Sequence, residues 1–238
     1  MSARPREIAA AAPPSRLGFV RPGWSGRNRL DAVARRPDVE VAALHDLDPA
    51  KLDAAAGTYA EAARPESFDA LLDADLDGVV IATPNGCHAE QAIACLERGL
   101  PVFCQKPLAL DGAQTRAVVA AADRADRLLG VDYSYRHVRG MAELRQHVRA
   151  GRLGDLLAVD LTFHNAYGPD KAWCHDRALA GGGCLLDLGV HLVDLALWLQ
   201  DDLDLAIVDS ARYAQGRRLP PADPAIEDLA FATFRSSG

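Results

Sequence analysis

The first half of the chain alternates short apolar runs, rich in β-branched residues, with longer amphipathic runs. Buried strands of a parallel sheet read as continuous apolar runs, and the helices between them follow a period near 3.6 residues. The alternation therefore predicts repeated βαβ units that build a parallel sheet. The predicted strands are 17–20, 39–44, 78–82, 101–104 and 128–135, and the predicted helices are 25–35, one opening at Asp48-Pro49, 88–98 and 113–127.

The pattern of hydrophobic and polar residues changes after Tyr135. A helical run at 138–150 precedes three runs of period two, at 156–163, 205–213 and 228–234, and this period is typical of half-buried antiparallel strands. An apolar helix that carries Asp187, His191 and Asp194 lies among them. We expect an α/β chain with a disordered tail at 1–15, a parallel-sheet domain at 16–135 and an α+β domain with a mostly antiparallel open sheet at 136–238.

Composition narrows the choice of partners. The chain has 238 residues, 49% of them hydrophobic, and a formal net charge of −7, which supports a sizeable core and argues against nucleic acid or membrane as a partner. Five cysteines without a C-x-x-C pair predict neither a disulfide framework nor a metal site, and they favour a reducing cytoplasm. We find no uninterrupted run of about 18 uncharged apolar residues, so we expect no membrane span.

The turn after the first predicted strand is a degraded dinucleotide-binding motif. Against G-x-G-x-x-G, Gly23 and Gly26 hold the second and third glycine positions, whereas Arg21 holds the first. The second glycine admits a pyrophosphate and the third allows close helix packing. Asp46 follows Gly26 by about 20 residues, where a carboxylate can bind the ribose 2′-OH of NAD. The alternative is an ordinary turn followed by a capping aspartate.

Polar residues also follow the third and fourth predicted strands. Thr83-Pro84-Asn85 and His88 come after one, and Gln105-Lys106-Pro107 after the other. Ligands of open α/β sheets bind at the carboxyl ends of the strands, where a lysine can stabilise a developing oxyanion. A plain turn with a solvated lysine is the alternative.

The apolar helix supplies the third group of polar residues. Asp187, His191 and Asp194 are spaced by four and three residues, so a helix places them on one face. A buried carboxylate or imidazole must be paired with another polar group or take part in binding or catalysis. A structural triad inside the helix is the alternative to a reaction centre.

Taken together, these segments resemble the glucose-fructose oxidoreductase, inositol dehydrogenase and MocA (Gfo/Idh/MocA) family of NAD(P)-dependent oxidoreductases. The matching pieces, in family order, are Gly23-Trp24-Ser25-Gly26, Asp46, Thr83-Pro84-Asn85 with His88, Gln105-Lys106-Pro107, Tyr135-Arg136, and Gly182-Gly183 through Asp187, His191 and Asp194. The resemblance implies an N-terminal Rossmann domain that binds the cofactor, and a C-terminal α+β domain that binds substrate and often forms the oligomer interface.

The resemblance also implies roles for particular residues. Catalytic residues would be Lys106, Asp187 and His191; cofactor contacts would come from Gly23, Trp24, Ser25, Gly26, Asp46, Thr83, Pro84, Asn85, His88 and Gln105; and substrate contacts from Arg136 and Asp194. Apart from the resemblance, Trp173 in the loop before the apolar helix is a candidate substrate contact, since aromatic rings stack on apolar sugar faces; the alternative is a tryptophan that anchors the loop. Oxidation of an alcohol needs a base such as histidine, a cation near the oxygen and a carboxylate that orients both. NAD is favoured over NADP, because Asp46 repels a 2′-phosphate and Leu47 supplies no arginine.

Two departures from the family bear on the prediction. Gln105 stands where members more usually carry glutamate, and the chain stops after the strand-like run Glu227 to Arg235, without strands that family members possess. An uncovered sheet edge predicts a homo-oligomer through the C-terminal sheet. We expect hydride transfer between a nicotinamide cofactor and a hydroxyl or carbonyl of a sugar, polyol or related small molecule. The alternative is a catalytically silent, shortened relative that acts as a binding or oligomerisation partner.

Overall fold

The computed structural model describes residues 13–22, 24–166, 168–201 and 204–236. Strand β1 begins at Ser15, which pairs with Val39. The prediction of a tail at 1–15 is therefore wrong at its last residue, because the sheet already satisfies the backbone there. The rest of the predicted tail, apart from Pro13 and Pro14, lies outside the described residues, as does Gly23.

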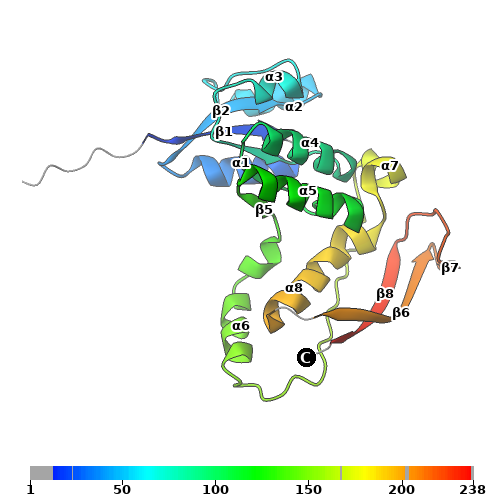
Figure 1. The fold of residues 1–238 in the computed structure, drawn as a ribbon. Coiled ribbons are helices and arrows are strands. Elements are labelled where there is room, and N and C mark those ends of the chain that lie inside the picture. The colour runs from blue at the N-terminus through cyan, green and yellow to red at the C-terminus, as the bar shows by residue number, and fades with distance from the viewer. Residues whose placement is uncertain (1–12, 23, 167, 202–203, 237–238) are drawn as a thin grey trace, which may run out of the picture.

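The predicted parallel sheet is confirmed (Figure 1). Its strands are β1 (Ser15–Val20), β2 (Val39–His45), β3 (Gly78–Ile81), β4 (Val102–Cys104) and β5 (Leu129–Val131), in the spatial order β2-β1-β3-β4-β5. The helices that connect them are α1 (Trp24–Ala34), α2 (Pro49–Ala56), α3 (Phe68–Leu72), α4 (Asn85–Glu97) and α5 (Gly112–Ala125). The strand order reverses direction between β1 and β3, and such a switch point opens a crevice at the carboxyl ends of the strands.

Apolar clusters cover both faces of this sheet. All four residues of β3 are buried. Val79 and Ile81 pack in a cluster that includes Leu96 of α4, whereas Val80 packs in a second cluster with Leu30 of α1. Successive side chains of a strand point to opposite faces, so a strand that is apolar at every position is explained by helices on both sides.

Several predicted boundaries shift. Helix α4 starts at Asn85 rather than His88, directly after Pro84, and the short helix α3 was not predicted. The fifth strand ends at Val131, and a 3-10 turn, Ser134–His137, replaces the rest of the predicted extended run. The predicted start of α2 is confirmed, because Asp48 accepts a hydrogen bond from the Ala50 amide.

The second half of the chain adds helices and a small antiparallel sheet. Its helical elements are α6 (Met141–Arg149), the 3-10 turn Ala172–His175, α7 (Arg177–Ala180), the π-helical turn η3 (Leu185–Gly189) and α8 (Val190–Gln200). Strands β6 (Leu205–Ala214), β7 (Arg217–Leu219) and β8 (Leu229–Ser236) pair in the order β7-β6-β8. In Figure 1, α8 runs between the parallel sheet and this second sheet.

The strand predicted at 156–163 is wrong. These residues are described and form no strand, and Leu157 is 95% exposed. Strand β6 pairs with β8 along most of its length and with β7 at Arg212 to Ala214, and the 156–163 run pairs with none of these strands. Alternation shows which side chains prefer burial, but a strand also needs a partner for its backbone groups. The hairpin to β7 was missed; it turns at Gln215-Gly216, both at positive φ, as a tight hairpin turn requires.

The segment Arg177–Gln200 is the one described stretch long and apolar enough to cross a membrane, although Asp187 and Asp194 interrupt its apolar run. By length and composition it passes as a spanning helix, with a mean hydropathy of 1.5. The helix of a protein core meets the same criterion, and this segment carries Asp187 and Asp194, whose carboxylates bond to Lys106 and Arg136. Those bonds tie the segment to the rest of the protein.

Candidate active site

Lys106 and Asp187 meet across the junction between the two halves of the chain. Lys106 follows β4, and its Nζ donates to the Asp187 carboxylate at 2.5 Å and to the Asp187 carbonyl at 2.7 Å. The lysine side chain is 16% exposed and the aspartate side chain 53%. The pair therefore lies at the mouth of a site rather than inside a core, with its charges within reach of a ligand.

His191 lies one helical turn further along and is buried. Its ring packs against Tyr135, with centroids 4.4 Å apart, and against Tyr133 at 6.3 Å. Burial, followed by the positive charge of Lys106, lowers the pKa of His191 to about 4. The imidazole is therefore neutral near pH 7 and able to accept a proton. Its Nδ1 atom is buried without a hydrogen-bond partner among the described residues.

A π-helical turn places Asp187 ahead of the regular helix. The Val190 amide bonds to the Leu185 carbonyl, five residues back, and α8 begins at Val190. The sequence predicted one regular helix, because apolar periodicity does not distinguish a single widened turn. Such turns occur frequently at functional sites, since they re-aim side chains within a helix.

Asp194, the third member of the predicted stripe, binds Arg136 instead of the Lys106 pair. Arg136 donates to both carboxylate oxygens, from Nε at 2.8 Å and from Nη2. This bonding raises the pKa of Arg136, and its guanidinium lies 5.7 Å from the centroid of the Tyr133 ring. Arg136 and Asp194 thus form a doubly hydrogen-bonded ion pair beside His191. Trp173, in the turn Ala172–His175, is half-buried.

The turn after β1 keeps the backbone shape of a glycine-rich motif. Arg21 has φ of 56°, the left-handed region that favours glycine, and its amide donates to the His45 carbonyl at 2.6 Å. A Cβ on Gly26 would lie 2.6 Å from the Arg21 carbonyl oxygen, so α1 approaches the turn closely where the third glycine stands. Trp24 and Ser25 open α1.

Asp46 has the features of a ribose-binding carboxylate. The residue is 8% exposed, and its Oδ1 accepts from the Asp48 amide at 3.0 Å. Its Oδ2 is buried and has no partner among the described residues. A buried carboxylate oxygen without a donor is costly, so a hydroxyl donor of a bound nucleotide fits there.

The residues after β3 are largely bonded to the protein. Thr83 Oγ1 donates to Gln91 at 2.6 Å, and Asn85 Nδ2 donates to the Ala180 carbonyl at 3.0 Å. His88 is fully buried, with Nδ1 2.7 Å from the Pro107 carbonyl and Nε2 2.8 Å from the Thr83 carbonyl. Burial lowers the pKa of His88, so its neutral ring donates to one of these two oxygens. Side-chain contacts from Asn85 and His88 thus hold the loops that flank the crevice.

Gln105 belongs to a buried polar group that the sequence did not reveal. Its Nε2 donates to Asp132 Oδ2 at 2.5 Å, and Arg29 Nε donates to the same oxygen at 2.5 Å. The Asp132 side chain is 9% exposed. Asp132 lies inside the run 128–135 predicted as the fifth strand and directly follows β5, which ends at Val131, so a polar residue within that apolar run was the available signal.

Glu227 was also missed as a site residue. It is 4% exposed and accepts hydrogen bonds from the backbone amides of Gly183 and Leu185, which precede Asp187 by four and two residues. No metal-binding group of three or more His, Cys, Asp or Glu side chains occurs in the part of the chain that the structure describes.

Known proteins resemble this chain over both halves. Residues 16–133 match an oxidoreductase family with an NAD-binding Rossmann fold, and residues 141–238 match the GFO/IDH/MocA C-terminal domain. The rhizopine catabolism protein MocA of Rhizobium meliloti is 34% identical over 188 residues, which are 77% of this chain and 56% of that protein. Inositol 2-dehydrogenase 3 of Saccharopolyspora erythraea is 30% identical over 223 residues, 93% of this chain and 63% of that protein.

A solved structure supports the same relationship. The WlbA dehydrogenase from Bordetella pertussis, in complex with NADH and UDP-GlcNAcA, is similar with a TM-score of 0.81 and 26% identity. The similarity covers 94% of this chain and 64% of that one. Across these three proteins, the chain spans between 56% and 64% of the relative's length.

Proposed function

The chain belongs to the Gfo/Idh/MocA family of oxidoreductases, and from this we propose that it transfers hydride between NAD and a hydroxyl or carbonyl carbon of a sugar, polyol or related small molecule. Its parallel sheet is the Rossmann fold that the family resemblance implies. The observation that carries the proposal is the meeting of Lys106, Asp187 and buried His191 beside the crevice of that sheet.

Each of these three residues has a task suited to its surroundings. The nicotinamide ring, when bound, supplies the chemistry of accepting or giving the hydride. His191, neutral because burial lowers its pKa, takes the hydroxyl proton on a ring nitrogen during oxidation and returns one during reduction. The Lys106 ammonium stabilises the oxyanion that develops on the substrate. Asp187 holds that ammonium in place at 2.5 Å.

The residues around the crevice fit a dinucleotide. We propose that the turn from Arg21 to Gly26 receives the pyrophosphate, and that Asp46 Oδ2 binds a ribose hydroxyl. Backbone at Thr83, Pro84 and Gln105 borders the nicotinamide end. Leu47 is 91% exposed where an NADP enzyme would use a cation, and the Asp46 carboxylate repels a 2′-phosphate, so NAD is the proposed cofactor.

The proposed substrate class rests on the names of similar proteins. Similar proteins carry names such as inositol 2-dehydrogenase and levoglucosan dehydrogenase, which act on compounds with several hydroxyls. We propose Arg136, Asp194 and Trp173 as the border of the substrate site, with Arg136 and Asp194 acting as a preformed pair. We further propose a homo-oligomer in the cytoplasm, where the five cysteines stay free.

A catalytically silent relative is the second candidate. The positive φ of Arg21, in a turn where the family motif has glycine, favours it. The intact geometry of Lys106 and Asp187 favours an enzyme.

Titration calorimetry with NADH and NADPH decides between the two functions. We expect heat with NADH, and weaker binding of NADPH. The Asp46→Ala variant should lose NADH affinity and narrow the difference between the cofactors, because the buried carboxylate oxygen would be gone. Absence of heat with both cofactors at about millimolar concentration, a weak but measurable range, would favour the silent relative. Turnover is then followed by NADH absorbance with inositol and other polyols.

A further inference from the structure

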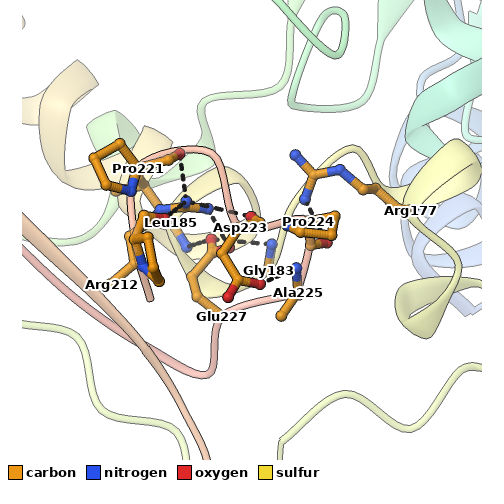
Figure 2. A network of polar contacts seen from close by, with 10 residues as sticks. Arg177, Gly183, Leu185, Arg212, Pro221, Asp223, Pro224, Ala225 and Glu227 are labelled. Atoms are coloured by element: carbon orange, nitrogen blue, oxygen red, sulfur yellow. Dashed lines mark hydrogen bonds and ion pairs between the residues drawn. The ribbon is translucent and has the colours of Figure 1, made fainter. Parts of the chain in front are cut away.

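Glu227 reaches from the loop before β8 to the start of the helix that carries the proposed reaction centre. Its Oε1 accepts hydrogen bonds from the Gly183 amide at 3.0 Å and from the Leu185 amide at 3.1 Å. Its backbone carbonyl accepts from the Cys184 amide at 3.0 Å. Three consecutive amides are therefore held by one residue that lies more than 40 positions away in the sequence. Figure 2 shows the Glu227 carboxylate beside Gly183 and Leu185.

These amides need such a partner. The first N–H groups of a helix have no acceptor within the helix, and a carboxylate is the strongest acceptor available for them. The negative charge also suits the positive end of the helix dipole. Arg212 Nη1 lies 3.9 Å from Glu227 Oε2, while its Nη2 donates to the Pro220 and Pro221 carbonyls, so the buried carboxylate has a fixed cation nearby.

Gly183 shows how closely the two segments approach. A Cβ at this position would lie 1.8 Å from the Glu227 carbonyl oxygen and 2.8 Å from the Glu227 nitrogen. Both are backbone atoms, so the loop itself would have to move. Because glycine has no Cβ, the Glu227 backbone can lie this close to Gly183. The Glu227 carboxylate is then within hydrogen-bond distance of the Gly183 and Leu185 amides.

We propose that Glu227 is a positioning residue for the reaction described above. Its carboxylate fixes the turn Gly183 to Leu185 and so holds Asp187, two residues further on, against Lys106. Asp187 meets the ammonium with both its carboxylate and its carbonyl oxygen, so a shift of the backbone at this turn disturbs both contacts. This role rests on the proposed oxidoreductase function. Glu227 touches no reacting atom in this arrangement and acts through Asp187.

Two variants of Glu227 and one matched control test the proposal. Glu227→Ala removes the acceptor, whereas Glu227→Gln keeps an oxygen for the two amides and removes the charge. Asp223→Ala is the control, because the carboxylate of this residue, in the same loop, bonds to the Ala225 amide and to Arg217. Its backbone carbonyl also accepts from Arg212 at 3.5 Å, a contact that alanine keeps. For each protein, kcat, KM and NADH affinity are measured, and hydrogen exchange is followed in the peptide that spans Gly183 to Leu185.

The expected results distinguish the role of Glu227 from that of Asp223, the acidic control residue in the same loop. Glu227→Ala should lower kcat by about 10- to 100-fold, the range of a displaced positioned group, with NADH affinity within about twofold of wild type. Amides 183 to 185 should exchange faster in this variant. Glu227→Gln should restore slow exchange and most of kcat, and Asp223→Ala should behave as wild type in both measurements.

Other results would overturn the proposal. If Glu227→Ala lowered thermal stability while the folded fraction kept its kcat, the contact would be structural only. Equal kcat losses in Ala and Gln variants would assign the effect to charge rather than to the hydrogen bonds. Equal loss of NADH affinity would place the effect at the cofactor.

A wild-type chain without turnover would contradict the proposed function but not the positioning role. Acylation of Lys106 by an amine-reactive ester, measured against Lys51 in the same sample, then replaces kcat. Glu227→Ala should free the ammonium from Asp187 and raise the Lys106 to Lys51 labelling ratio by about threefold or more, a change well above the weak effect of an exposed ion pair. An unchanged ratio in Glu227→Ala would show that Glu227 does not hold Asp187 against Lys106.

Discussion

The two sheets of this chain are stabilised in different ways. All four residues of β3 are buried between helices, whereas most residues of β6 and β8 are exposed, including Ile207 at 69% and Phe231 at 60%. Apolar burial contributes roughly 25 cal/mol per Å², so the parallel sheet has its own source of stability. The stability of the antiparallel sheet depends more on its polar contacts and on a partner surface that covers its exposed apolar side chains.

The proposed reaction centre lies where these two regions meet. Lys106 comes from the well-packed half, and Asp187 and His191 come from the other half. Polar contacts join the halves: Lys106 with Asp187, Asn85 with the Ala180 carbonyl, and Glu227 with the start of the helix. A change in one of these contacts should therefore impair the proposed reaction centre while the parallel sheet stays folded.

Gly183→Ala should have the largest effect. Its Cβ would overlap Glu227 backbone atoms, so we expect a loss of about 3 kcal/mol or more in the stability of the second region, as for other overpacked sites. NADH binding to the parallel-sheet region should survive. Limited proteolysis and calorimetry of the same sample check both expectations.

Gly182→Ala is the matched control for Gly183→Ala. Its Cβ would lie 3.3 Å from Leu186 Cβ, a contact that a movement of a few tenths of an ångström relieves, whereas the Gly183 contact is 1.8 Å. Neither glycine has a positive φ among the described residues, so backbone strain does not separate them. Equal destabilisation by the two changes would contradict the close approach of Glu227.

Lys106→Ala and His191→Ala come next in size. Each should lower kcat by about 100-fold or more, the usual share of a positioned acid, base or charge, with NADH affinity nearly unchanged. Lys51→Ala is the control, since Lys51 pairs with Asp48 at the surface. Normal turnover in the folded fraction of a destabilised His191→Ala protein would instead indicate a structural histidine.

The exposed face of the antiparallel sheet gives the third prediction. We expect the chain to self-associate through β6 and β8, because large apolar patches on monomers are uncommon. Phe231→Glu should weaken this association by about 2 kcal/mol or more, the range of an interface hot spot. Val119→Glu is the control: Val119 is 44% exposed on α5, in the other region. Light scattering after size exclusion would contradict the prediction if wild type is monomeric at tens of micromolar, a concentration at which stable dimers persist.

The same contrast explains what the sequence predicted. The parallel strands were found because their burial on both faces leaves continuous apolar runs, as in Gly78 to Ile81. The 156–163 strand was predicted from alternation alone and does not form, because pairing depends on which other strands are present. The polar stripe and the order of the motifs predicted Lys106, Asp187 and His191 as the reaction centre, and the structure brings Lys106 and Asp187 into contact. Asp132, Arg29 and Glu227 were missed, because their roles arise from contacts between segments far apart in the sequence.

Arg21→Gly should have the smallest effect, and it acts in the well-packed region. Arg21 holds φ of 56°, so glycine should stabilise the protein by about 1 kcal/mol through relief of the left-handed strain. Asp126→Gly is the matched control, because Asp126 has φ of 51° at the end of α5. It should gain similar stability without any change in NADH binding.

The Arg21→Gly and Asp126→Gly variants should differ in their effect on NADH binding. Arg21 directly follows β1, at the carboxyl edge where we place the pyrophosphate, and its positive charge offsets part of the rise that burial causes in the pKa of the Cys87 thiol. A charge-assisted hydrogen bond contributes about 1.5 kcal/mol or more, so Arg21→Gly should weaken NADH binding by at least that amount in calorimetry. Tighter binding in Arg21→Gly would show that the side chain obstructs the phosphates. The turn after β1 would then hold a side chain that weakens NADH binding.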